Sequence, residues 1–181
     1  DATPKELGGY VLTPAPVVAD LALPDASRDG MSFPFKAATG RLLVVYFGYM
    51  SCPDVCPTTL NEFKNALKDA RSVGSKVDLA MVTVDPGRDT GANLTRYVQG
   101  FVPGAHALRT DDQTLLTTVA KTFGASYSVT TDAKGAIVVT HTAAMYLVDS
   151  TGTVVLTWPY GGIQRDGMAT DLRTLFDRGV K

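Results

Sequence analysis

Residues 42–57 read LLVVYFGYMSCPDVCP, an apolar run followed at once by the only two cysteines of the sequence. The run from Arg41 to Phe47 has the length of one strand and is rich in valine and aromatic residues, which is typical of a central strand covered on both faces. If a helix starts at Pro53, the sulfurs of Cys52 and Cys56 lie one turn apart at its first turn. Backbone amides and the helix dipole favour the thiolate form at that position.

Two structural roles compete with a reactive thiol pair: inert core cysteines and a structural disulfide. A bridge between Cys52 and Cys56 would close a loop too short to constrain much of the unfolded chain. Prolines follow both cysteines and Asp54 lies between them. This pattern favours an exposed strand-to-helix turn over a packed core. Thiolates in such a turn reduce disulfides or ligate soft metals.

Composition narrows the class of protein. The chain has 181 residues, 45% of them hydrophobic, which is enough for one substantial core in a single domain. The formal net charge is −1 and the basic residues are scattered, so the sequence does not support a nucleic-acid surface. Residues 1–16 read as an arm or linker and residues 17–181 as the domain. Since the chain begins at Asp1, we expect that a targeting segment has been removed.

Along the chain, predicted strands alternate with predicted helices. Strands are expected over 17–23, 31–35, 41–47, 77–84, 105–109, 126–130, 136–140, 143–148 and 154–158, and helices over 53–70, 90–99, 112–123 and 165–178. Residues 132–135 form the turn of a hairpin. The last two strands are joined by a turn too short for a parallel crossover, so the sheet is mixed. The fold class is therefore α/β, thioredoxin-like in layout, with a mixed central sheet flanked by helices and an added hairpin before His141.

Few other side chains are candidates for site chemistry. Of the two histidines, His141 opens an apolar strand and can project at the cysteines, whereas His106 in the turn after Pro103 is expected to have no ligand role. Asp85, Arg88 and Asp89 follow the strand next to the cysteine strand, at the edge of the sheet where sites gather. The same charged turn is also explained by capping of the next helix, by Asp89 or Thr90.

Three segments resemble the signature segments of the Sco (SenC-type) copper-binding proteins. They are YFGYMSCPDVCPTTL at 46–60, VDPGRDT at 84–90 and HTAAMYLVD at 141–149. All three occur in this order, and the match covers most of the chain from about Val17 onward. The resemblance implies a thioredoxin fold, tethered on the outer side of a bacterial membrane or of the inner mitochondrial membrane. It also implies a role in assembling the dinuclear copper centre of cytochrome c oxidase.

The resemblance assigns copper to Cys52, Cys56 and His141. Two thiolates and one imidazole form a soft site that suits Cu(I) and, through the nitrogen, also holds Cu(II). The same Cys52 and Cys56 are expected to form a redox-active disulfide that gates metal binding. Asp85, Arg88 and Asp89 are expected to surround this site. Residues 108–112 are more charged than the resemblance predicts and the hairpin before His141 is short, and both differences would affect partner docking.

The resulting function is a copper carrier, with a thiol-disulfide oxidoreductase as the alternative. The carrier would exchange copper with the copper-bearing subunit of cytochrome c oxidase or with another copper chaperone, as a monomeric domain that needs a thiol reductant and binds no nucleic acid. The reductase would instead keep the oxidase cysteines reduced. A peroxiredoxin-like peroxidase shares the fold but is disfavoured, because Met50 stands near the position where its threonine would be sought. The expected location is the periplasm or the outer face of the cytoplasmic membrane, anchored by a segment missing from this chain, or the mitochondrial intermembrane space in a eukaryote.

Overall fold

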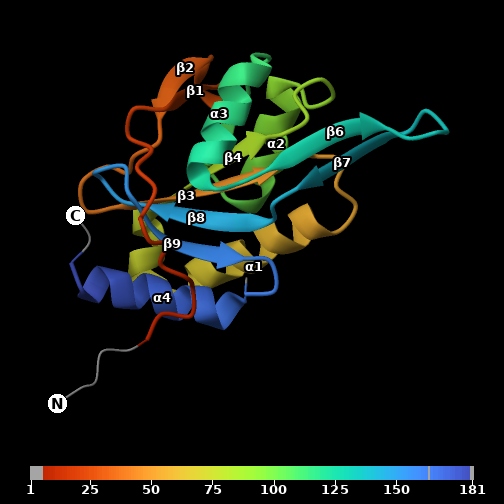
Figure 1. The fold of residues 1–181 in the computed structure, drawn as a ribbon. Helices are drawn as coiled ribbons and strands as arrows, with labels where there is room; N and C mark the ends of the chain where they lie inside the picture. The colour runs from red at the N-terminus through yellow and green to blue at the C-terminus, as the bar shows by residue number, and fades with distance from the viewer. Residues whose placement is uncertain (1–5, 163, 180–181) are drawn as a thin grey trace.

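The computed structural model describes residues 6–162 and 164–179, and its centre is a mixed seven-stranded sheet (Figure 1). The strands, in spatial order, are β2 (Met31–Pro34), β1 (Ala22–Asp25), β5 (His106–Leu108), β4 (Val77–Thr83), β3 (Leu42–Gly48), β8 (Ala144–Val148) and β9 (Val154–Pro159). Strands β3, β4 and β5 run parallel, β8 is antiparallel to β3, and β9 is antiparallel to β8. The predicted α/β class and mixed sheet are confirmed.

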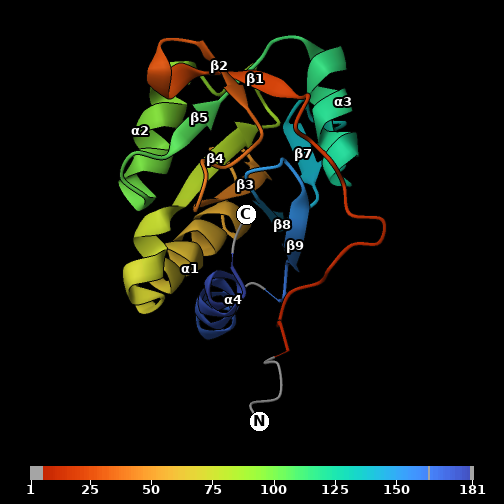
Figure 2. The same cartoon turned by 90° about the vertical axis from the view of Figure 1, so that its left-hand side faces the viewer.

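Helices cover the two faces of the sheet unequally. Figure 2 shows α1, α2 and α4 on one side and α3 on the other. The helices are α1 (Val55–Asp69), α2 (Gly91–Phe101), α3 (Gln113–Phe123) and α4 (Arg165–Asp177), with two 3₁₀ turns, η1 (Ala26–Arg28) and η2 (Arg71–Lys76). Each face encloses its own apolar core, so the cysteine-bearing helix α1 belongs to the core that it shares with α2 and α4.

Strand β3 lies at the centre of both cores, and all seven of its residues are buried. Because side chains alternate across a strand, Val44 and Tyr46 face the core under α1, while Val45 and Phe47 face the core under α3. The apolar run therefore predicted a strand covered on both faces correctly, and this alternation places Tyr46 on the same side as the cysteines.

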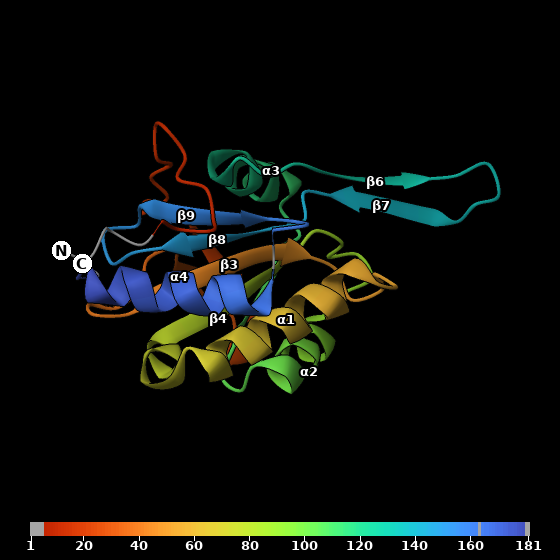
Figure 3. The same ribbon diagram turned by 90° about the horizontal axis from the view of Figure 1, so that it is seen from below.

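A second, two-stranded sheet projects from the body. It consists of β6 (Tyr127–Thr131) and β7 (Ile137–His141), and Figure 3 shows it extending beyond the main sheet at the end where α1 begins. The predicted turn is confirmed, since the carboxylate of Asp132 accepts hydrogen bonds from the amides of Lys134 and Ala136. The hairpin delivers His141 back to the main sheet just before β8 begins.

The first predicted strand, at 17–23, was placed too early. The ladder begins only at Ala22, and Val17 makes one isolated bridge to Thr153. The amide of Val18 instead donates to the carbonyl of Gly152, and the amide of Leu21 donates back to Val18. These local bonds turn the chain before it can join the sheet.

Residues just upstream contact the domain. The amides of Gly8 and Gly9 donate to the buried carboxylate of Asp171 at 2.8 and 2.9 Å, and Tyr10 pairs with Thr157 of β9. The indole Nε1–H of Trp158 donates to the same carboxylate at 2.8 Å. Asp171 therefore ties this segment to α4 and β9.

Candidate metal and thiol site

The helix that carries the cysteines begins at Val55, two residues later than predicted. Cys52 therefore precedes α1 and Cys56 is its second residue. Asp54 stands at the N-cap but makes no capping bond with its side chain. The sulfur of Cys52 instead accepts the hydrogen bond of the Cys56 amide at 3.3 Å. A thiol thus takes the role of the cap, since the first amides of a helix need acceptors from outside it.

Both cysteines are buried, although the turn that carries them is exposed at Ser51, Pro53 and Asp54, as expected. Cys56 is fully buried and Cys52 is 9% exposed. The reason lies in neighbouring elements that the sequence pattern did not place: the β6–β7 hairpin returns over the turn, and the side chains of the core under α1 enclose Cys56.

His141 lies beside these sulfurs. It is the last residue of β7, rather than the first of the following strand as expected, and its Nε2 is 3.6 Å from Sγ of Cys56. When Nδ1–H donates to the carbonyl of Thr142 at 3.3 Å, the lone pair of Nε2 faces the sulfur. The ligand atoms of Cys52, Cys56 and His141 all lie within 4.8 Å of one another. Among the described residues no other group of three or more such side chains could hold a metal ion.

The two thiols differ in acidity. Burial raises the pKa of both, but for Cys52 the hydrogen bonds from the backbone and thiol of Cys56 outweigh burial and hold its pKa below the usual value. For Cys56 burial dominates and raises the pKa to about 12. The prediction that the helix start favours thiolate therefore holds for Cys52 and is wrong for Cys56. Burial also lowers the pKa of His141, so its imidazole is neutral and able to bind a metal at pH 7.

The charged turn after β4 holds the cysteine loop in place. The carboxylate of Asp89 accepts hydrogen bonds from the amide of Met50 at 3.0 Å and from the hydroxyl of Thr83 at 2.6 Å. Asp85 pairs with Arg88. Asp85, Arg88 and Asp89 thus lie near the site without joining the group of metal-binding atoms. The cap of α2 is supplied by Thr90.

Arg109, in the charged segment 108–112, has a role that sequence reasoning missed. Its guanidinium donates to the carbonyls of Pro86 and Asp89, each at 2.9 Å. Arg109 therefore supports the turn after β4, and that turn holds the loop before Cys52. The extra charge of segment 108–112 was visible in the sequence. The sequence did not show that the side chain of Arg109 contacts the turn after β4.

The other histidine, His106, lies away from this group. It is on β5, and its Nδ1 is 2.7 Å from the carboxylate of Asp25.

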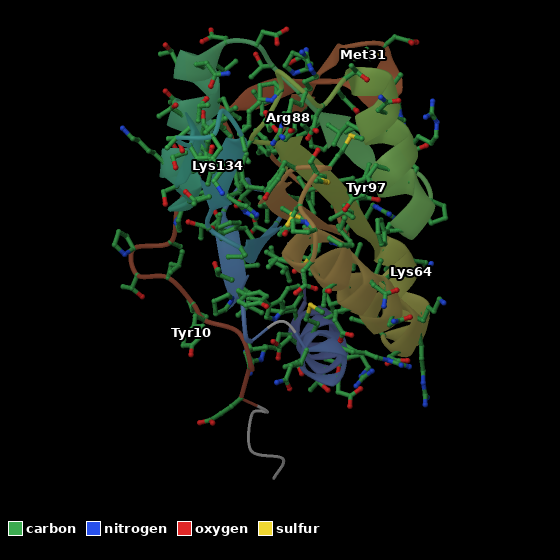
Figure 4. All side chains as sticks on the ribbon, turned by 90° about the vertical axis from the view of Figure 1, so that its right-hand side faces the viewer. Tyr10, Met31, Lys64, Arg88, Tyr97 and Lys134 are labelled. Atoms are coloured by element: carbon green, nitrogen blue, oxygen red, sulfur yellow. The ribbon has the colours of Figure 1, made fainter. Side chains whose placement is uncertain are left out.

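A groove of about 300 Å³ opens beside the cysteines and the histidine. Its walls include Cys52, His141 and Tyr49, together with Val139 of the hairpin and Tyr160 after β9. The rings of Tyr46 and Tyr49 stand edge-on to His141, with centroids 6.2 and 5.7 Å away. Seen from the end toward which the hairpin points, Arg88 lies between Lys134 of the hairpin turn and Tyr97 of α2 (Figure 4). A partner can reach Cys52 through this groove, while Cys56 lies behind it.

A thioredoxin-like sheet with two cysteines at the start of a helix and a histidine brought to them by a hairpin defines the class: a thiol protein with a Cys-Cys-His group that could hold a metal ion. Residues 23–177 match the model of the SCO1/SenC family, so the chain belongs to that family. The predicted thioredoxin-like fold and the resemblance stated from the sequence are confirmed.

Individual relatives agree with this assignment. A SCO2-like protein of Rickettsia prowazekii is 32% identical over 129 residues, which are 69% of this chain and 62% of that protein. The solution structure of apo Sco1 from Thermus thermophilus is 28% identical with a TM-score of 0.78, covering 96% of this chain and 99% of that one. Bradyrhizobium japonicum ScoI, solved with copper bound, is 29% identical with a TM-score of 0.70, covering 84% of this chain and 95% of that one.

The match to the curated relatives is partial in length. The aligned region spans about three fifths of the first two of them, 62% and 60%. Further relatives include mitochondrial Sco proteins of human and Arabidopsis thaliana. In the described part of this chain, no helix combines the length and apolar composition needed to cross a bilayer.

Proposed function

We propose that this protein binds copper through Cys52, Cys56 and His141 and delivers it to the copper-bearing subunit of cytochrome c oxidase. The observation that carries the proposal is that two sulfurs and one imidazole nitrogen lie within 4.8 Å of one another, with both cysteines buried. Copper is the cargo in this proposal. A carrier must hold it tightly enough to exclude water and loosely enough to release it.

The donor set suits both oxidation states of copper. Two thiolates are soft ligands that favour Cu(I), and the imidazole adds the nitrogen that Cu(II) prefers. The lowered pKa of His141 means that no proton has to leave the imidazole at neutral pH. The more acidic and more accessible Cys52 is the ligand that a partner thiolate would replace first, and Cys56 would release copper last.

A second candidate function is thiol-disulfide exchange, and the unequal thiols favour it. A low-pKa thiol near the surface beside a buried high-pKa thiol suits a pair in which Cys52 attacks a client disulfide. Cys56 would then displace the client, so that the client gains two thiols and this chain gains the Cys52–Cys56 disulfide. An external thiol reductant would have to return the pair to the reduced state.

A His141 variant distinguishes the two functions, because metal binding needs the imidazole and thiol exchange does not. In cells that lack this protein, at normal expression and low copper, we expect His141→Ala to leave oxidase activity mostly unrestored. His106→Gln, which removes the other imidazole, should restore it. If His141→Ala restored oxidase activity fully while Cys52→Ser and Cys56→Ser did not, the function would be thiol reduction and not copper delivery.

Mitochondrial Sco relatives support the setting that we propose. We place the protein in the periplasm or on the outer face of the cytoplasmic membrane, or in the mitochondrial intermembrane space of a eukaryote, with residues 17–181 as the copper-binding domain. Two sulfurs that must stay reduced to bind metal would need a thiol reductant in such an oxidising compartment.

A further inference from the structure

Tyr46 carries a buried hydroxyl without a partner, one step from the cysteines. The residue is fully buried, and its phenol oxygen makes no hydrogen bond of good geometry within the described chain, although Cys56 and Thr59 lie within its reach. Buried polar groups are nearly always hydrogen-bonded, and the exceptions tend to have a function. A phenylalanine would fill the same space in β3 without this cost, so the hydroxyl calls for an explanation.

The position of the ring suggests the explanation. Gly48 leaves open the space between β3 and α1: a Cβ there would lie 2.7 Å from Cε1 of Tyr46 and 3.1 Å from Sγ of Cys56. The absent side chain thus lets the hydroxyl-bearing edge of the ring approach the sulfur. The ring also stands edge-on to His141. Tyr46 therefore faces two of the three metal-binding groups from the floor of the site.

The electrostatics agree with this placement. Burial, then the neighbouring Cys56, raise the pKa of Tyr46 far above its usual value, so the phenol remains a hydrogen-bond donor at neutral pH. Cys56 is one of the two groups within reach of this hydroxyl, the other being Thr59. The hydroxyl and a charged sulfur would stabilise each other.

A charged sulfur is present when copper is bound. Cu(I) with two thiolates and a neutral imidazole leaves one negative charge in a buried place, whereas Cu(II) with the same ligands is neutral. Arg88, whose charge reaches Tyr49 beside the site, is already paired with Asp85. A buried negative charge needs nearby donors, and bonds to charged acceptors are the strong ones.

We propose that the phenol O–H of Tyr46 donates a hydrogen bond to the sulfur of Cys56 when copper is bound there, and that this bond favours Cu(I) over Cu(II). The inference rests on the proposed copper site. Tyr46 is then a positioning residue whose hydroxyl lacks a well-formed hydrogen bond in the free protein and gains one in the loaded protein. Gly48 is the neighbour whose lack of a side chain permits the approach.

The test compares Tyr46→Phe with the wild type in both states. Because the hydroxyl has no partner in the free protein, the variant should unfold at the same or a higher temperature. Its affinity for Cu(I) should fall about tenfold, as expected for a lost bond to a charged acceptor. Its affinity for Cu(II) should change by less than about threefold, and the sulfur-to-Cu(II) absorption band should move to lower energy because the sulfur becomes a stronger electron donor.

Tyr146→Phe is the matched control. Tyr146 is also buried and aromatic, but it lies in the core under α3, on the opposite face of the sheet. It should change neither Cu(I) affinity nor the absorption band. An unchanged Cu(I) affinity in Tyr46→Phe, in a wild type that binds Cu(I), would overturn the inference and leave the copper site standing. A wild type that binds no Cu(I), or Cu(I) retained after Cys56→Ser, would overturn the proposed function instead.

Discussion

At the scale of single residues, the contrast between Cys52 and Cys56 determines what the thiol pair can do. Cys52 caps α1 with its sulfur and keeps a small exposed fraction, whereas Cys56 is enclosed. Since the thiolate is the reactive species, the cysteine with the lower pKa and the better access should react first. The same asymmetry serves stepwise copper release and disulfide exchange alike.

We therefore expect iodoacetamide to modify Cys52 well before Cys56 in the reduced, metal-free protein. The rate at Cys52 should rise with pH with a midpoint below 9.0, because its pKa lies below that ordinary value, and Cys56 should follow only through local opening. Mass spectrometry of the two positions over a series of quenched samples measures both rates. Equal rates at pH 7 would show that the sulfurs are equivalent in solution.

At the scale of elements, the buried carboxylate of Asp25 joins the β1–β2 hairpin to β5. The carboxylate of Asp25 is 2.7 Å from Nδ1 of His106, and it accepts hydrogen bonds from the amides of Ser27 and Ala107 at 2.9 and 3.1 Å. Burial raises the pKa of Asp25, but these bonds outweigh burial and hold the pKa below 3.8. Strands β1 and β5 pair at one register position, Asp25 with Leu108. The hydrogen bonds of the Asp25 carboxylate therefore strengthen the contact between these two strands.

Asp25→Asn should destabilise the protein in a pH-dependent way. The folded pKa of Asp25 is lower than the unfolded one, so its stabilisation is complete above about pH 3.8 and disappears as the pH falls through the folded value. At pH 7 we expect a loss of about 1–3 kcal/mol in the free energy of unfolding. Urea denaturation at pH 7, 5 and 3 measures the difference between variant and wild type. A difference that stays constant down to pH 3 would contradict the role of the charge.

The helices and strands were predicted from the sequence more successfully than the residues at which they end and their contacts with other segments. The alternation of apolar and polar residues located the helices and most strands, because burial on one face leaves that periodicity in the chain. The start of α1 was misplaced by two residues because its cap is a cysteine sulfur, which no capping pattern includes. The burial of Cys56 and the orphan hydroxyl of Tyr46 depend on contacts between distant segments, which leave no local signal.

At the scale of the whole molecule, the sheet brings three distant segments to one end. The loop after β3 carries the cysteines, the turn after β4 holds that loop through Asp89, and the hairpin ahead of β8 returns His141. The carboxyl ends of parallel strands are where such sites form, so the topology accounts for the meeting. In the proposed copper site, both thiols must be reduced before they can bind the metal beside His141.

The most direct test of the copper site is a titration of the fully reduced protein with Cu(I) against a series of chelators of increasing strength. The account predicts one tightly bound Cu(I) per chain in the wild type. It predicts loss of that binding in Cys52→Ser and Cys56→Ser, because a hydroxyl is a hard, protonated donor. Because Cys56 is buried, a serine at this position also affects the stability of the fold. The Cys56→Ala variant, which adds no polar group, and a thermal unfolding curve of each variant distinguish loss of the ligand from loss of the fold. One Cu(I) still held tightly by a folded Cys56→Ser protein would contradict the site.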